Sequence, residues 1–356
     1  MVVEQRPLIH GRSLAALADW CKARGEPAFR ARQIWKWLYQ RRAASAAGMT
    51  DLPAATRHAL ESEFEFQAVS LAGSDAASGP DAGTRKLLLG LRDSACVETV
   101  LIPARGHLTV CVSSQVGCAF ACAFCASGQA GFDRNLEPGE MVGQVLAAAS
   151  AAGAAPGNVV FMGMGEPLDN YDAVLAAIRI LNDPDGLRIG ARRITVSTCG
   201  LAPAIRRLSD EGMQLELSVS LHAADDALRS RLMPVNRRYP LAELMDACAV
   251  YIRKTDRIIT FEYTLIGGVN DGPAQARALA RLIGRLKCRV NLIPLSPVEE
   301  FAGQAGEPAR MRDFALILDR ARINVTVRKS RGAGVRAACG QLRKRHLSAG
   351  QPNATE

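Results

Sequence analysis

The chain has 356 residues, enough to bury a substantial core, and its 48% hydrophobic and 22% charged residues are an ordinary globular composition. Lys and Arg outnumber Asp and Glu by 44 to 35, and this net charge of +9 fits a polyanionic partner without identifying one. No signal core and no run long enough to span a bilayer is present, which argues against a secreted or membrane protein. We therefore expect a cytoplasmic protein, in which ten cysteines suit metal binding or redox chemistry better than structural disulfides.

The first part of the chain, residues 1–70, is predicted to be a helical accessory domain. Apolar residues recur at mostly helical spacings from residue 13 to residue 66. The second predicted helix interleaves basic residues with Trp35, Trp37 and Tyr39, which could rest on RNA phosphates and bases. The alternative is a small bundle whose aromatic side chains form its core and whose charges are simply solvated.

Residues 71–107 are predicted to form a linker and a β-rich extension. Small and turn-forming residues fill positions 72–84, a pattern typical of a linker or a hairpin loop. Two short apolar runs follow, at 86–91 and 96–102. The second run carries Glu98, which strand alternation alone would turn toward solvent.

From residue 108 onward, apolar strands alternate with helices. Strands are predicted at 108–114, 158–163, 193–198, 214–220, 258–266 and 288–295, and helices at 138–151, 171–182, 203–211, 240–254 and 273–286. A last helix at 308–321 and a strand at 323–328 complete the pattern. Such alternation implies an α/β fold with a parallel sheet buried on both faces. Six units predict a partial (β/α)6 barrel over 108–347, with its chemistry at the carboxyl ends of the strands and a disordered tail after it.

Three cysteines follow the first barrel strand in a C-x3-C-x2-C array, at Cys118, Cys122 and Cys125. Thiolates at this spacing can bind three irons of a [4Fe-4S] cluster and leave the fourth iron open. An open iron can hold the amino and carboxylate groups of S-adenosylmethionine, whose reductive cleavage yields a 5'-deoxyadenosyl radical. The array therefore predicts radical chemistry.

Two simpler interpretations of the three cysteines remain open. A structural zinc site would need a fourth ligand that the pattern does not supply. Three buried cysteines without a metal are the other alternative, although Gly117 before the array and Ser127 and Gly128 after it indicate a turning loop.

Residues at the ends of later strands could form a rim around a cofactor. Gly165 and Glu166 follow the second barrel strand, where glycine lets backbone approach a ligand and a carboxylate can accept a hydrogen bond from an ammonium. Ser197 ends the third strand, and residues 220–222 end the fourth. His222 by itself is more typical of a structural histidine hydrogen-bonded at a strand end.

Taken together, these segments resemble the RlmN/Cfr family of radical-SAM RNA methyltransferases, and the resemblance runs from about residue 12 to residue 347. Its motifs stand at 29–35, 97–100, 111–118, 131–136, 163–168, 196–198, 220–223, 269–272 and 338–342. Two cysteines outside the array, Cys111 and Cys339, match the extra pair that sets this family apart from other radical-SAM enzymes.

The resemblance implies a radical methyltransferase acting on C2 of an adenine in 23S rRNA, and on tRNA as a second substrate. By resemblance, Cys339 carries the methyl group, Cys111 resolves the intermediate and Glu98 accepts a proton. The cofactors implied are a [4Fe-4S] cluster and two molecules of S-adenosylmethionine per turnover. Residues that would contact S-adenosylmethionine are Gly165, Glu166, Ser197, Ser220, Leu221, His222 and Ser296. The partners implied are RNA and an electron donor such as a flavodoxin or ferredoxin system, with the enzyme as a monomer.

Several alternatives stay open beside this assignment. Methylation of C8, or of a different RNA, would keep the same fold and cofactors, and a non-catalytic zinc or iron-sulfur RNA-binding module is a third hypothesis. Cys111 could take the proton in place of Glu98. Cys339 could instead be a buried cysteine before a glycine helix cap. The sequence departs from the family at residues 333–336, where acidic residues are common, and at Ser296, where Asn is common.

Overall fold

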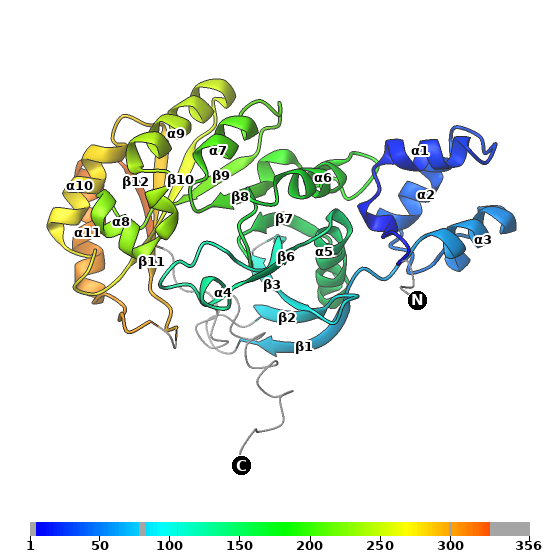
Figure 1. The fold of residues 1–356 in the computed structure, drawn as a ribbon, viewed down its shortest axis with the longest axis horizontal. Coiled ribbons are helices and arrows are strands. Elements are labelled where there is room, and N and C mark those ends of the chain that lie inside the picture. The colour runs from blue at the N-terminus through cyan, green and yellow to red at the C-terminus, as the bar shows by residue number, and fades with distance from the viewer. Residues whose placement is uncertain (1–4, 78–82, 105, 299–300, 328–356) are drawn as a thin grey trace, which may run out of the picture.

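The computed structural model describes residues 5–77, 83–104, 106–298 and 301–327 (Figure 1). Cys339 and the rest of the predicted cysteine loop lie outside these residues. Within the described ranges, no helix combines the length and apolar character that crossing a membrane requires.

Three short helices form the N-terminal part of the molecule, to one side of the sheet (Figure 1). They are α1 (Leu14–Lys22), α2 (Arg30–Tyr39) and α3 (Ala54–Glu63). Trp35 and Tyr39 are each only 1% exposed, which confirms the bundle interpretation for these two aromatics. Trp35 also donates an indole hydrogen bond to Asp183, 3.0 Å away, and so joins the bundle to the main domain. Trp37 remains half-buried beside the exposed Arg41 guanidinium.

The main domain is built on one ten-stranded sheet whose strands run in the order β1-β2-β3-β4-β7-β8-β9-β10-β11-β12. The first pairs are antiparallel and join β1 (Ser70–Ala76), β2 (Arg85–Gly90), β3 (Cys96–Ala104) and β4 (His107–Cys111). β1 and β2 form an antiparallel hairpin, but residues 72–76 belong to strand β1 and not to the linker or hairpin loop expected over 72–84.

The remaining strands are parallel and form the predicted partial barrel. From β4 the sheet continues through β7 (Pro156–Phe161), β8 (Ile194–Thr198), β9 (Glu216–Ser220), β10 (Ile259–Leu265), β11 (Cys288–Pro294) and β12 (Asn324–Val327). Each predicted barrel strand is present with bounds shifted by a few residues. Parallel pairing buries both faces of such strands, which is why they read as apolar runs.

Helices cover the outer face of the curved sheet (Figure 1). The predicted ones are α5 (Pro138–Ala152), α6 (Tyr171–Asn182), α7 (Ala202–Leu208), α9 (Leu241–Thr255), α10 (Pro273–Ile283) and α11 (Pro308–Arg320). Val110, Val159 and Val196 are fully buried and belong to the hydrophobic core that these helices share with the sheet. Two short helices were not expected from the sequence, α4 (Ala126–Gln129) and α8 (Asp226–Leu232).

Strand register decides which side chains face the inside of the barrel. The Thr99 hydroxyl donates to Gln144 of the outer helix α5 at 2.9 Å, so the neighbouring Glu98 points to the opposite, inner face. Cys111 pairs directly with Val100 of β3, so these two side chains lie on one face of the sheet. Glu98 is two residues before Val100 in the same strand and therefore lies on that face too.

The same inner face continues across the parallel strands. Cys111 pairs with Val160 of β7, and Val160 pairs with Thr195 of β8, two residues before Ser197. The register thus puts Glu98, Cys111 and Ser197 on one face of the sheet.

Candidate active site

The three clustered cysteines lie in a loop carried by a small hairpin after β4. The hairpin pairs β5 (Gln115–Gly117) with β6 (Phe132–Asn135). Gly117 has φ +79°, and a Cβ there would stand 1.9 Å from the Gly131 carbonyl oxygen, so only glycine fits. Cys118 donates its backbone N–H to that same oxygen at 2.8 Å. The turning-loop interpretation of the array is therefore confirmed.

The cysteine loop and the ends of the barrel strands line a shared cavity of about 250 Å³. The predicted site residues that line it are Cys118, Cys122, Cys125, Gly165, Glu166, Ser197, Ser220 and His222. Leu221 is not among its lining residues, because its side chain is fully buried in the core, and neither is Ser296, which follows β11. The side chains that line the cavity therefore come from the loop and from several strands at once, as expected at the carboxyl end of a barrel.

The donor set fits an iron-sulfur cluster. Burial raises the pKa of Cys118 to about 12, and burial followed by the nearby Cys125 and Cys118 thiols raises that of Cys122. Three thiolates this close therefore need positive charge, which iron supplies. Among the described residues, no group of three or more His, Cys, Asp or Glu side chains is already arranged to hold a metal ion.

Glu166 is held by the loop that leaves β7. Gly165 has φ +97°, and a Cβ there would approach the Gln115 side chain to 2.5 Å. The Glu166 carboxylate is buried and accepts backbone N–H groups from Leu168 at 3.0 Å and Cys199 at 2.6 Å. Burial raises the pKa of Glu166, and these donors oppose the rise. Each carboxylate oxygen has a second lone pair for a ligand ammonium.

His222 has a structural role in addition to its place in the cavity. It adopts φ +57°, its Nδ1 accepts the Thr264 N–H at 2.9 Å, and its ring meets Phe124 edge-on at 4.8 Å. Burial, followed by the charge of Arg229, lowers its pKa to about 3, so the ring is neutral. The structural interpretation is confirmed, and contact with S-adenosylmethionine stays a prediction.

Arg229 is a residue that sequence reasoning missed. It comes from the unpredicted helix α8, is fully buried and donates to the carbonyl oxygens of Cys199 at 2.7 Å and Ser220 at 3.1 Å. These contacts tie together the ends of β8 and β9 beneath the cavity. From the sequence alone, an arginine in a short helix would be expected to face solvent. The only sequence feature that indicated the helix was its N-cap residue, Asp225.

Several further residues that line the cavity were not predicted to belong to the site. Cys199 is buried and lines the cavity. Thr198, Met233 and Glu262 line it too. For Thr198 the available signal was its position at the end of a predicted strand, whereas Met233 follows helix α8 and Glu262 lies in the middle of β10, where no such signal exists.

The expectation that Glu98 faces solvent was wrong. The side chain is 2% exposed, and its Oε2 lies 3.1 Å from Nζ of Lys86, which is 1% exposed. Alternation fails here because the inner face of β3 is itself covered. Cys111 is also buried, at the end of β4.

A three-cysteine loop after the first parallel strand of a partial barrel, above a cavity lined by the next strand ends, defines a radical-SAM enzyme. Comparison with known proteins agrees, because residues 112–280 match the radical SAM superfamily model. Residues 9–66 match the model of the ribosomal RNA large subunit methyltransferase N-terminal domain.

Relatives that match nearly the whole chain identify the family within this class of enzymes. The chain is 47% identical to the probable dual-specificity RNA methyltransferase RlmN of Synechococcus elongatus, over 99% of this chain and 97% of that one. It is 48% identical to the protein of the same name from Moorella thermoacetica, over 90% and 92%. A radical SAM methyltransferase from Sphaerobacter thermophilus superposes with a TM-score of 0.89 at 46% identity, covering 94% of this chain and 98% of that one.

The chain belongs to the RlmN family of radical-SAM RNA methyltransferases, as its motifs predicted. It is an S-adenosylmethionine-dependent enzyme with a [4Fe-4S] cluster, and its substrate is RNA. The zinc interpretation of the cysteine array and the non-catalytic module are therefore set aside.

Proposed function

We propose that this enzyme methylates C2 of an adenine in 23S rRNA, with tRNA as a second substrate, through a methyl group carried on Cys339. The observation that carries the proposal is the shared inner face of Glu98 and Cys111, which continues across the sheet to Ser197 at the cofactor cavity. The N-terminal family model named for a large-subunit rRNA methyltransferase supports the choice of rRNA, and relatives named dual-specificity support a second RNA.

The cavity residues hold the cofactors in this proposal. Cys118, Cys122 and Cys125 bind the cluster, while Glu166 accepts a hydrogen bond from the ammonium of S-adenosylmethionine. The polar Ser197 and Ser220 and the neutral His222 contact the rest of that ligand, with Leu221 behind them and Ser296 at the end of β11. When bound, the cluster and S-adenosylmethionine supply the radical that removes a hydrogen atom from the cysteine-bound methyl group.

The chain's own residues carry the methyl group and the proton. C2 of adenine is electron-poor, so it does not attack a sulfonium methyl as a nucleophile would. The Cys339 thiolate therefore takes a methyl group first, and the carbon later joins C2 while still bound to sulfur. Glu98 then accepts the proton that leaves C2.

Cys111 releases the product in the last step. Its sulfur attacks the Cys339 sulfur, the carbon–sulfur bond breaks, and the methylated base leaves a Cys111 to Cys339 disulfide. Forming this disulfide removes two electrons from the two thiols, and cleavage of S-adenosylmethionine to methionine and 5'-deoxyadenosine takes up two. An external reductant reopens the disulfide before the next turnover.

Methylation of C8 is the second candidate reaction, because every group named above would serve it equally. Mass spectrometry of RNA from cells with and without the gene separates the two. Loss of 2-methyladenosine on deletion supports the proposal, and loss of 8-methyladenosine instead would replace it.

The proposed chemistry also indicates the compartment in which the enzyme works and the partner that supplies its electron. RNA and reducing conditions that keep thiols available both belong to the cytoplasm, where we place the protein. A flavodoxin or ferredoxin system supplies the electron, and the enzyme acts as a monomer.

The direct test is anaerobic reconstitution followed by assay on rRNA fragments and tRNA. The expected products are 5'-deoxyadenosine and RNA containing 2-methyladenosine. Formation of 5'-deoxyadenosine with no methylation of any RNA would contradict the proposed reaction.

A further inference from the structure

A buried ion pair links two neighbouring strands on the inner face of the sheet. Lys86 of β2 and Glu98 of β3 approach to 3.1 Å between Nζ and Oε2, with exposures of 1% and 2%. Lys86 pairs directly with Val100, and Glu98 with Leu88, so the ion pair runs diagonally across the strands. Val100 in turn pairs with Cys111, which puts all three functional groups on one face.

Stability alone does not account for this pair. Burying a carboxylate and an ammonium is costly, and a buried ion pair contributes little beyond what a well-packed apolar pair would contribute. Leu88 pairs directly with Glu98 on the same face and is itself buried and apolar, so this face can pack an apolar side chain in place of a charge. The ion pair is therefore better explained by what its carboxylate does.

We propose that Lys86 is a positioning residue that orients Glu98 as the proton acceptor. This inference rests on the proposed role of Glu98. The Lys86 ammonium compensates the charge of the buried carboxylate and holds Oε2 in place at 3.1 Å.

The proton balance follows from the same pair. When the carbon–hydrogen bond at the adenine ring carbon breaks, its electron pair stays in the ring and its proton goes to the Glu98 carboxylate. Glu98 becomes neutral, and Lys86 is left as a buried ammonium facing an uncharged acid. Loss of this proton to solvent restores the ion pair for the next turnover.

The test compares Lys86→Met, Glu98→Gln and the double variant, each as the reconstituted enzyme with RNA. Three quantities are measured: methylated RNA, 5'-deoxyadenosine, and RNA that stays covalently attached to denatured protein. Both single variants should still form 5'-deoxyadenosine and should accumulate attached RNA. Methylated RNA should fall by about 100-fold in each, as expected for losing a general base.

The double variant separates positioning from a merely structural role. If Lys86 acts only through Glu98, adding Lys86→Met to Glu98→Gln should lower methylation no further. Lys86→Arg should restore most of the activity, and the exposed Lys22→Met should leave it unchanged. Should Lys86→Met fail to fold, Lys86→Gln, which keeps a hydrogen-bond donor without the charge, carries the same expectation.

Two results would overturn different parts of the account. A further loss of methylation in the double variant, or a Lys86→Met enzyme that loses 5'-deoxyadenosine formation and never retains RNA, would refute the role of Lys86. A Glu98→Gln enzyme with wild-type methylation would instead refute the proposed role of Glu98.

Discussion

Glycine at position 165 shows how single residues shape the cavity. It combines φ +97° with a site where a Cβ would stand 2.5 Å from the Gln115 side chain and 2.8 Å from the Gln115 backbone nitrogen. Both features exclude a side chain, for reasons of backbone conformation and of space. Gln115 also accepts the Glu166 N–H at 2.8 Å, so a shift at one residue moves the other.

Gly165→Ala should therefore weaken S-adenosylmethionine binding by at least about tenfold and lower the free energy of unfolding by about 1–3 kcal/mol. Equilibrium dialysis and urea unfolding measure the two effects. Gly190→Ala is the matched control, because a Cβ there meets nothing within 4 Å. Equal behaviour of the two variants would contradict the steric argument.

His10 gives the molecule a pH-dependent stability. Burial lowers its pKa from 6.5 to about 4, opposed by a hydrogen bond with the Phe66 backbone. Between these values the unfolded chain binds more protons than the folded one, so stability falls as pH falls. The expected loss from this group is about 2 kcal/mol between pH 7 and pH 5.

Urea unfolding of wild type and His10→Gln at both pH values measures this effect. The substitution should flatten the pH dependence by about the same amount, and His58→Gln, at an exposed position, should leave it unchanged. An identical pH slope in wild type and His10→Gln would show that His10 does not titrate as described.

Helix α5 organises the elements around the inner face. Its Gln144 is fully buried, accepts from the Thr99 hydroxyl at 2.9 Å and the Ser113 N–H at 2.8 Å, and donates to the Ser113 carbonyl at 3.0 Å. The Ser113 hydroxyl then donates to the Glu98 carbonyl at 2.6 Å and accepts the Met164 N–H at 3.0 Å. One side chain thus joins the strands that carry Glu98 and Cys111 to the loop before Glu166.

Replacing this glutamine should uncouple those elements. Gln144→Leu leaves three buried polar groups without their partner, and each unsatisfied group costs about 1–3 kcal/mol. The free energy of unfolding should fall by about 3 kcal/mol or more, measured by urea unfolding, whereas the exposed Gln214→Ala should change it little. A stable Gln144→Leu protein would mean that other contacts hold these strands.

Some strands and helices are easier to predict from the sequence than others. The barrel strands are predictable because strands buried on both faces, such as β10, are rich in apolar, aromatic and β-branched residues. Helix α8 is too short to show a period, and its buried Arg229 finds carbonyl partners that only the folded chain brings near. Likewise, Glu98 is buried because Lys86 lies diagonally across from it, a pairing that depends on register and not on composition.

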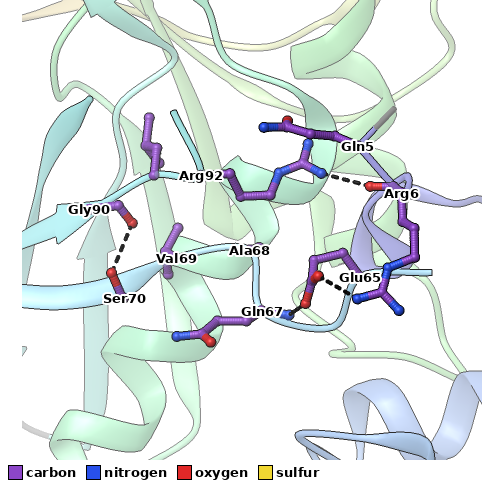
Figure 2. A pocket seen from close by; sticks show the side chains of 10 residues that line it. Gln5, Arg6, Glu65, Gln67, Ala68, Val69, Ser70, Gly90 and Arg92 are labelled. Atoms are coloured by element: carbon purple, nitrogen blue, oxygen red, sulfur yellow. Dashed lines mark hydrogen bonds and ion pairs between the residues drawn. The ribbon is translucent and has the colours of Figure 1, made fainter. Parts of the chain in front are cut away.

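At the scale of the whole molecule, a cleft of about 630 Å³ lies where the N-terminal segment meets the β1–β2 edge (Figure 2). Arg6 and Arg92 line it; Arg6 pairs with Glu65 at 3.0 Å, and Arg92 donates to the Arg6 carbonyl at 2.7 Å. Gln5 and Gln67 also line the cleft, on opposite sides of the view in Figure 2. Because two guanidinium groups line the cleft, we expect it to contact phosphates of the RNA backbone.

Arg6→Gln should weaken RNA binding without changing 5'-deoxyadenosine formation. Losing one phosphate contact should reduce the slope of log affinity against log salt by about 1. Fluorescence anisotropy with labelled rRNA fragments over a range of salt concentrations measures the slope, with Arg320→Gln on α11 as the control. An unchanged slope would remove the cleft from the RNA path.

The most direct measurement of the central claim compares Cys111→Ala and Cys339→Ala proteins purified from cells. The relay predicts that Cys111→Ala carries RNA covalently attached to the peptide containing Cys339, because the resolving thiol is missing. Cys339→Ala should carry none, because no methyl group can be loaded. Equal attachment in both variants, or attachment to a different peptide, would contradict the relay.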